Sequence, residues 1–230
     1  MPTVLITGAN RGLGLEFTRQ YAADGWQVLA CCRQPESADA LDAIARSSNK
    51  VRVLALDVAD LDAIDTLAKT LRDTAIDLII NNAGIYPDHH GGLGAIDYDA
   101  WMLAFRVNTM APLKVAEAFT PHLERGAGKL IATVSSKMGS LDDNTSGGCY
   151  LYRSSKTAVN MVMKSLSLDL AARGIRAVIL HPGWVQTDMG GANALINAEQ
   201  SVSGMRRVLA RVTEAQSGHF ISYDGKEIPW

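Results

Sequence analysis

The chain has 230 residues, of which 47% are hydrophobic and 20% are charged, with a formal net charge of −2. This composition is typical of a globular protein, and we expect one domain that spans residues 1–230. A near-neutral chain without basic blocks argues against nucleic acid as a partner. No apolar run approaches the roughly 18 residues that cross a bilayer, and residues 1–12 lack the features of a signal peptide. The sequence therefore predicts a cytoplasmic protein without a membrane or nucleic-acid partner.

Short β-rich runs alternate with longer segments of helical pattern along the whole chain. The expected strands cover residues 3–7, 26–32, 51–57, 76–80, 128–136, 175–181 and 219–223. The expected helices cover residues 13–24, 37–47, 60–71, 98–124, 150–173 and 201–215. The helical period is clearest in 60–71, where apolar residues recur at i, i+3, i+4 and i+7 from Ile64 and Asp60 is placed as the N-cap.

Strands that alternate with helices pair in parallel, because parallel neighbours need a crossover connection. Near-continuous apolar strands fit a sheet that is covered on both faces. We therefore predict an α/β protein: a single-domain, doubly wound Rossmann fold whose seven-stranded parallel sheet has helices on both faces. Segments 86–97 and 139–148 lack a regular pattern, and such loops tend to edge the ligand crevice.

The first strand and the first helix are joined by the glycine-rich stretch TGANRGLG at 7–14. Glycines here permit a tight turn and the close approach of a pyrophosphate, and the helix N-terminus adds N–H groups and a positive dipole. A plain turn is the alternative, but the strand–turn–helix context favours nucleotide binding. The expected cofactor contacts are Gly8, Asn10, Arg11, Gly12, Leu13 and Gly14.

The end of the second strand indicates which dinucleotide binds. A carboxylate there would bind the ribose 2′-OH of NAD, whereas this chain has Cys32 and then Arg33. Arg33 and Arg11 could hold a 2′-phosphate by charge-assisted hydrogen bonds, and two solvated surface arginines are the alternative. The sequence therefore predicts NADPH/NADP+ as the cofactor, with NADH less favoured.

Tyr152 and Lys156 lie four residues apart in the expected helix 150–173. Residues four apart differ by roughly 40° around a helix, whereas Tyr150, six before Lys156, differs by roughly 120°. A phenol with a pKa near 10 transfers protons poorly at neutral pH, and a nearby ammonium is expected to lower that pKa. This pair can therefore serve proton transfer, and a surface cation beside an aromatic ring is the alternative.

The sequence resembles the short-chain dehydrogenase/reductase family, in which a TGxxxGxG turn near the start is followed later by a YxxxK pair. The resemblance runs through almost the whole chain and includes NNAG at 81–84 and HPGWVQTDM at 181–189. It implies the catalytic residues Asn108, Ser136, Tyr152 and Lys156, with Ser136 rather than Ser135 active in the SS pair. The further cofactor contacts that it implies are Asp57, Val58, Asn81, Ala83, Gly84, Tyr152, Lys156, Pro182, Gly183, Val185 and Thr187.

The resemblance implies hydride transfer from the nicotinamide to the carbonyl of an aldehyde or ketone. Tyr152 would donate the proton, Ser136 would hold the carbonyl oxygen, and Asn108 would position a water that links Lys156 to solvent. Lys156 would also lower the tyrosine pKa and bind the nicotinamide ribose. The CCRxP after the second strand and the ending SGHFISYDGKEIPW look like C-factor and Sniffer-type carbonyl reductases.

Other readings stay open. A cofactor-binding signalling or sensor protein of the same fold is one, since a C-factor relative is associated with developmental signalling. A Rossmann-like methyltransferase would need an acidic residue after the second strand, and a sugar-nucleotide epimerase would need a longer chain. The helix within 150–173 could also form a homodimer contact through its apolar residues, and burial in the core of a monomer is the alternative explanation for them. These residues are Val159, Val162, Met163, Leu166 and Leu168.

No metal is expected. The DHH stretch at 88–90 has neither HExxH nor Cys/His spacing around it, so an exposed polar loop is the preferred interpretation. Cys31 and Cys32 are adjacent and Cys149 is alone, so neither a CxxC motif nor a disulfide framework is present.

Overall fold

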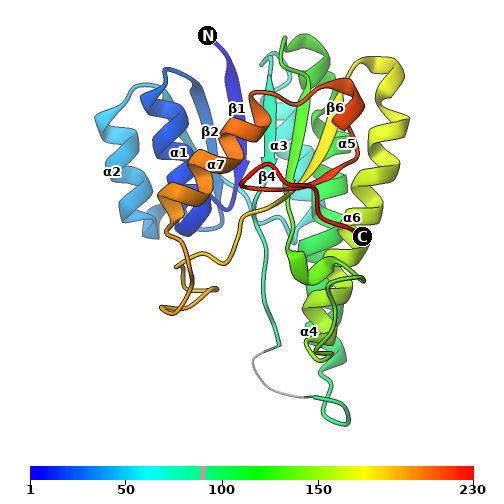
Figure 1. Cartoon of the computed structure of the whole chain (residues 1–230). Helices are drawn as coiled ribbons and strands as arrows, with labels where there is room; N and C mark the ends of the chain where they lie inside the picture. The colour runs from blue at the N-terminus through cyan, green and yellow to red at the C-terminus, as the bar shows by residue number, and fades with distance from the viewer. Residues whose placement is uncertain (89–91) are drawn as a thin grey trace.

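The computed structural model describes residues 1–88 and 92–230 of the chain. Over these residues the strands are β1 Thr3–Thr7, β2 Gln27–Cys32, β3 Val51–Ala55, β4 Leu78–Asn81, β5 Leu130–Val134, β6 Arg176–His181 and β7 Phe220–Ser222. The α-helices are α1 Gly12–Ala23, α2 Asp39–Ser47, α3 Leu61–Thr70, α4 Tyr98–Phe105, α5 Ala111–Arg125, α6 Tyr150–Asp169 and α7 Ala198–Leu209. Figure 1 shows the alternation of strands and helices along the chain.

The strands form one sheet in the order β3-β2-β1-β4-β5-β6-β7, and every neighbouring pair is parallel. The predicted doubly wound Rossmann fold is therefore confirmed. The strand order reverses beside β1, which pairs with β2 on one side and with β4 on the other. In such sheets the ligand crevice opens at the carboxyl ends of the strands on either side of this reversal.

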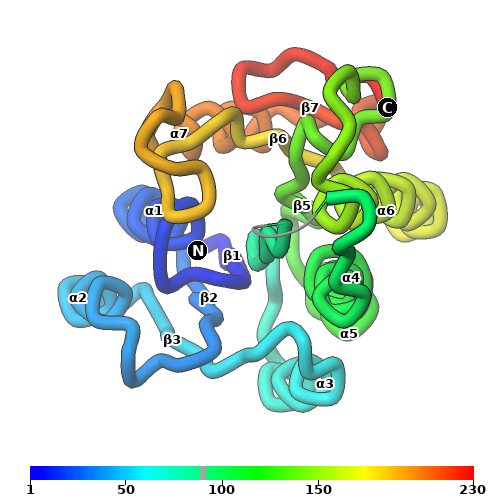
Figure 2. Tube along the Cα trace, turned by 90° about the horizontal axis from the view of Figure 1, so that it is seen from below, coloured from blue at the N-terminus to red at the C-terminus, as the bar shows by residue number. Residues whose placement is uncertain are grey.

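Helices cover both faces of the sheet. Helices α1, α2 and α7 lie on one face and α3, α5 and α6 on the other, as the view in Figure 2 shows. Successive residues of β1 point to opposite faces, so Val4 and Ile6 pack in one core with Phe17 while Leu5 packs in the other with Phe119. Because both sides of each central strand are buried, the strands read as continuous apolar runs.

The expected long helix within 98–124 is divided. Helix α4 is joined to α5 by a π-helical turn at Arg106–Met110, where the extra residue per turn widens the helix around Asn108. Helix α7 begins at Ala198, three residues before the expected start, because Asn197 and Gln200 form a capping box there. Amphipathic periodicity does not predict either feature, since each depends on local hydrogen bonding.

The residues proposed for a dimer contact belong mainly to the monomer core. Val159, Met163 and Leu166 are buried against the sheet, and Val162 packs at the edge of the same core. Leu168 is 67% exposed. Burial within a single chain therefore explains most of these apolar residues without a homodimer.

The described residues contain neither a helix that could span a membrane nor a cluster of metal ligands. Over 1–88 and 92–230, no helix has both the length and the apolar character to cross a membrane. In the same ranges no group of three or more His, Cys, Asp or Glu residues could hold a metal ion. His89 and His90 of the DHH stretch lie outside the described residues.

The N-cap of α3 gives a prediction about stability. Asp60 accepts hydrogen bonds from the backbone N–H groups of Asp62 and Ala63, each at 3.1 Å, as the sequence predicted. Replacing Asp60 by Ala should lower the free energy of unfolding by about 1 kcal/mol, because two N–H groups lose their acceptor. Urea unfolding of the wild-type protein and of Asp60→Ala measures the change. Equal stability of the two would show that water replaces the Asp60 side chain as acceptor without cost.

Candidate active site

A cleft of about 720 Å³ opens at the carboxyl ends of the central strands. It extends from the glycine turn before α1 to the buried first turns of α6, and many of the residues predicted from the sequence line it. Those predicted residues are Gly8, Asn10, Arg11, Gly12, Leu13, Arg33, Asp57, Val58, Ala83, Gly84, Tyr152, Lys156, Pro182 and Thr187. One cavity therefore holds both the expected phosphate site and the expected proton-transfer pair.

The glycine turn can accept a pyrophosphate for two reasons. Gly8 and Gly12 adopt φ values of +67° and +53°, which side chains disfavour, and a Cβ on Gly14 would lie 2.1 Å from the Gly8 carbonyl oxygen. The N-terminus of α1 also lacks a side-chain cap from Arg11 and has no acidic residue in its first turn. Its N–H groups and dipole are therefore available to an anion.

Asn82, which sequence reasoning missed, holds this turn in place. Its Nδ2 donates to the carbonyls of Thr7 at 2.9 Å and Gly8 at 3.1 Å, and its backbone N–H donates to Thr7 Oγ1 at 3.0 Å. The predicted residue Asn81 points away from the cleft, where its Nδ2 donates to Pro112 O and Thr133 Oγ1, each at 3.3 Å. Consecutive strand residues face opposite sides, so only one asparagine of the pair could reach the turn.

The two arginines predicted for the 2′-phosphate both line the cleft. Arg33 follows Cys32 at the end of β2. Arg11 Nη1 lies 2.5 Å from Asp188 Oδ2, and both of these side chains are largely exposed. Asp188, another residue missed from the sequence, thus links the glycine turn to the segment after β6.

Tyr152 and Lys156 lie together on the inner face of α6. They are 7% and 5% exposed, whereas Tyr150 is 41% exposed, as the helical spacing predicted. Lys156 Nζ lies 5.6 Å from the centroid of the Tyr152 ring and donates to the Val134 carbonyl at 3.0 Å. The predicted pair is therefore formed at the wall of the cleft, and the ammonium is anchored on the end of β5.

Ser136 lies beside Tyr152 and acts to lower the pKa of its phenol. The neighbouring Ser135 is buried and donates instead to Asn160 Oδ1 at 2.6 Å. Ser136 is therefore the serine that acts on the phenol, although Ser135 is the one that lines the cleft.

Burial dominates the electrostatics of the pair. It raises the pKa of Tyr152 to about 12, although Ser136 acts in the opposite direction. Burial also lowers the pKa of Lys156 to about 8. The expected lowering of the Tyr152 pKa by Lys156 is thus wrong for this structure, because desolvation of the phenol is the larger effect. At neutral pH the phenol keeps its proton, which is the state that a proton donor requires.

Asn108 is buried within the π-helical turn, behind the cleft wall. Its Oδ1 accepts from Ile85 N at 2.9 Å, and its Nδ2 donates to Ile85 O at 2.9 Å and to Ser155 Oγ at 3.0 Å. A Cβ on Gly84 would lie 3.2 Å from Asn108 Oδ1 and 3.6 Å from Lys156 Nζ. The side-chain amide therefore fixes the chain after β4 close to the lysine.

The remaining predicted contacts shape the segment after β6. Gly183 has φ +85°, and a Cβ there would lie 2.7 Å from Ile196 Cδ1. Val185 is 5% exposed and forms a β-bridge with Ile196. Thr187 faces the glycine turn, where its methyl group would lie 3.4 Å from a Cβ on Gly12. Thr187 therefore lines the cleft, whereas Gly183 and Val185 are not among its lining residues.

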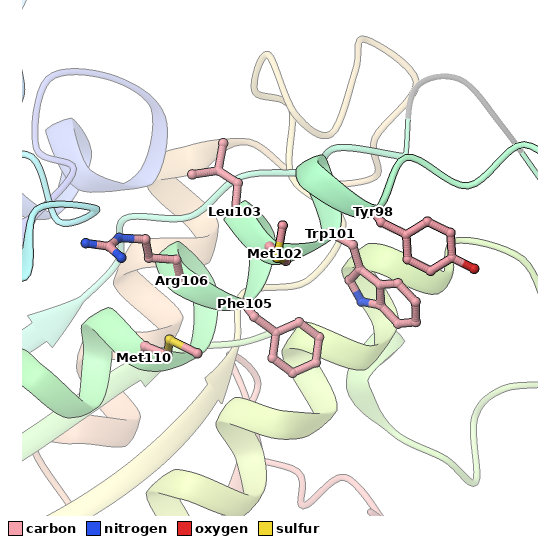
Figure 3. Close-up of a pocket in the computed structure, with 7 residues that line it drawn as sticks. All are labelled: Tyr98, Trp101, Met102, Leu103, Phe105, Arg106 and Met110. Carbon is pink, nitrogen blue, oxygen red and sulfur yellow. The ribbon is translucent and has the colours of Figure 1, made fainter.

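A second, apolar hollow of about 660 Å³ lies on α4, on the side shown in Figure 3. Trp101 and Phe105 point toward α6, and Trp101 Nε1 donates to Ser154 Oγ at 2.8 Å. Met102 and Met110 are 64% and 52% exposed. Helix α4 is therefore fixed to α6 through Trp101, while its outer side leaves apolar surface uncovered.

Residues 2–198 match the family described as short chain dehydrogenase. The chain belongs to this family of oxidoreductases. Among curated relatives, C-signal of Myxococcus xanthus is 47% identical over 155 residues, which cover 67% of this chain and 93% of C-signal. The predicted family resemblance is confirmed.

Two solved structures share the whole fold. The carbonyl reductase Sniffer of D. melanogaster is 34% identical, with a TM-score of 0.93 and complete coverage of both chains. The NADPH-bound carbonyl reductase from chicken fatty liver is also 34% identical, with a TM-score of 0.93 over 100% of this chain and 99% of that one. The fold of this chain is thus shared with these two carbonyl reductases.

The lowered pKa of Lys156 predicts a pH dependence. The ammonium keeps its charge below a pH of about 8 and loses it as the pH rises through that value. With NADPH as the varied substrate, kcat/KM reports the free enzyme and should fall above a pH of about 8. Lys156→Arg, which stays charged, should flatten this profile. An unchanged decline in that variant would assign the titration to another group.

Proposed function

We propose that this protein reduces the carbonyl group of a small aldehyde or ketone to an alcohol, with NADPH as the reductant. One observation carries the proposal: the buried side chains of Tyr152 and Lys156 line the same cleft as the glycine turn. Two carbonyl reductases share this fold over essentially their whole length.

The cleft residues fit a dinucleotide with a 2′-phosphate. The glycine turn and the uncapped N-terminus of α1 would hold the pyrophosphate, and Arg33 with Arg11 would hold the 2′-phosphate. NADPH supplies the hydride when it is bound there. The similar chicken carbonyl reductase is an NADPH-bound structure, which supports the same cofactor here.

The chain's own groups would manage the proton and the developing charge. Ser136 would donate a hydrogen bond to the carbonyl oxygen, and Tyr152 would deliver its proton to that oxygen as negative charge develops. Lys156, whose amine is anchored on the Val134 carbonyl, would bind the ribose of the nicotinamide. Asn108 would act from behind the site, because its amide already holds Ile85 and Ser155.

The substrate is expected to be apolar near its carbonyl. Tyr86 stacks edge to face on Tyr152, with ring centroids 4.8 Å apart, and so forms an aromatic wall beside the proton donor. Trp184, in the segment after β6, is 51% exposed and would add a second aromatic surface.

Tyr152→Phe tests the role of the phenol. The change removes the proton donor and keeps the ring, so carbonyl reduction should fall by roughly 10²-fold or more. NADPH binding, followed by fluorescence, should change little. Tyr150→Phe is the matched control on the exposed side of α6, and it should keep wild-type turnover. Undiminished turnover in Tyr152→Phe would contradict the assignment.

Arg33→Ala tests the cofactor preference. Loss of a guanidinium beside the 2′-phosphate should weaken NADPH binding by roughly 10-fold and leave NADH binding nearly unchanged. Dissociation constants for both cofactors, measured by fluorescence titration at one salt concentration, provide the comparison. If the ratio of the two constants stays at its wild-type value, another residue selects the cofactor.

The likeness to C-signal favours a second candidate, a cofactor-binding signalling protein with little turnover. The two candidates differ in what happens to NADPH. Loss of NADPH absorbance with a panel of aldehydes and ketones would support the reductase. Tight NADPH binding without turnover of any member of the panel would support signalling.

A further inference from the structure

The start of helix α6 has an unusual hydrogen-bond arrangement. The residues just before it are Gly147, Gly148 and Cys149, and all three adopt left-handed φ values of 65°, 66° and 48°. Cys149 occupies the N-cap position but makes no side-chain hydrogen bond to the helix. The first N–H groups of an α-helix have no partner within the helix, so acceptors must come from elsewhere.

Asp88 supplies these acceptors from a distant part of the chain. Its Oδ2 accepts from the backbone N–H of Tyr152 at 2.7 Å, and its Oδ1 accepts from that of Leu151 at 3.3 Å. A carboxylate at this end of a helix is also favoured by the helix dipole. The residue whose phenol acts in the site is therefore held through its own backbone by a carboxylate 64 positions earlier in the sequence.

A second contact comes from the same segment. The Tyr86 hydroxyl lies 3.1 Å from Cys149 Sγ, and the Tyr86 ring packs against that of Tyr152. At its base, Ile85 is fixed by two hydrogen bonds to Asn108. The chain after β4 thus contacts the backbone and the ring of Tyr152, and it is itself anchored to the π-helical turn.

We propose that Asp88 is a positioning residue for the reaction: it caps α6 from the chain after β4 and thereby fixes the orientation of the Tyr152 phenol. The inference rests on the proposed function. A small displacement of a catalytic group costs far more in rate than in stability, because proton transfer requires an aligned donor and acceptor. Asp88 therefore contributes to kcat without touching cofactor or substrate.

The test compares Asp88→Ala with Asp60→Ala. Each change removes a carboxylate that accepts two helix N–H groups, but α3, which Asp60 caps, carries none of the proposed catalytic residues. Both should lower stability to urea by similar amounts. Only Asp88→Ala should lower kcat, by roughly 10-fold or more, with the NADPH dissociation constant within about 2-fold of wild type.

Asp88→Asn keeps one oxygen acceptor and should restore part of the lost kcat, and it replaces Asp88→Ala in the comparison if that variant does not fold. Amide hydrogen exchange gives a readout that does not depend on activity. Exchange at Leu151 and Tyr152 should accelerate roughly 10-fold in Asp88→Ala, with no change in the second half of α6.

Three outcomes would overturn the inference: wild-type kcat in Asp88→Ala, an equal loss of kcat in Asp60→Ala, or unchanged exchange at Tyr152. Failure of the proposed function looks different. A wild-type protein that reduces no carbonyl compound would end the reductase proposal, whereas faster exchange at Tyr152 in Asp88→Ala would still support the cap.

Discussion

The site depends on one constraint, which is that every strand of the sheet runs in the same direction. Parallel strands end at a common edge, so the segments after β1, β4, β5 and β6 converge although they are far apart in sequence. The glycine turn follows β1, Asn82 follows β4, Ser136 follows β5 and Thr187 follows β6. Helix α6 then passes behind β5 and brings Tyr152 to the same edge. The fold therefore brings the glycine turn and the proposed proton donor together in one cleft.

Burial gives this pair its chemical character. A phenol with a pKa of about 12 and an amine with a pKa of about 8 are both shifted toward their neutral forms, because charge is poorly solvated between α6 and the sheet. A hydrogen bond from Lys156 to the Val134 carbonyl offsets part of that cost for the amine. A phenol that keeps its proton near neutral pH is in the state that the proposed role of Tyr152 requires.

Local spacing was enough to predict much of this. The glycine turn follows from a local motif and the pairing of Tyr152 with Lys156 from helical spacing, while the fold follows from the alternation of strands and helices along the chain. Asn82 and Asp88 were missed because their roles depend on partners more than 60 positions away, and no local pattern marks such contacts. For a related reason, the sequence led us to expect a lowered pKa for Tyr152, whereas burial raises it. Sequence proximity suggested a dominant ammonium, whereas the depth of burial is a property of the packed molecule.

The central claim is that the cofactor site and Tyr152 form one reaction site. A crystal structure with NADP+ bound tests it most directly. We expect the pyrophosphate beside Gly12, the 2′-phosphate beside Arg33, and the nicotinamide ring facing the Tyr152 hydroxyl, with space for a carbonyl group between them. A nicotinamide ring that lies away from Tyr152, or a phosphate site elsewhere on the molecule, would contradict the account.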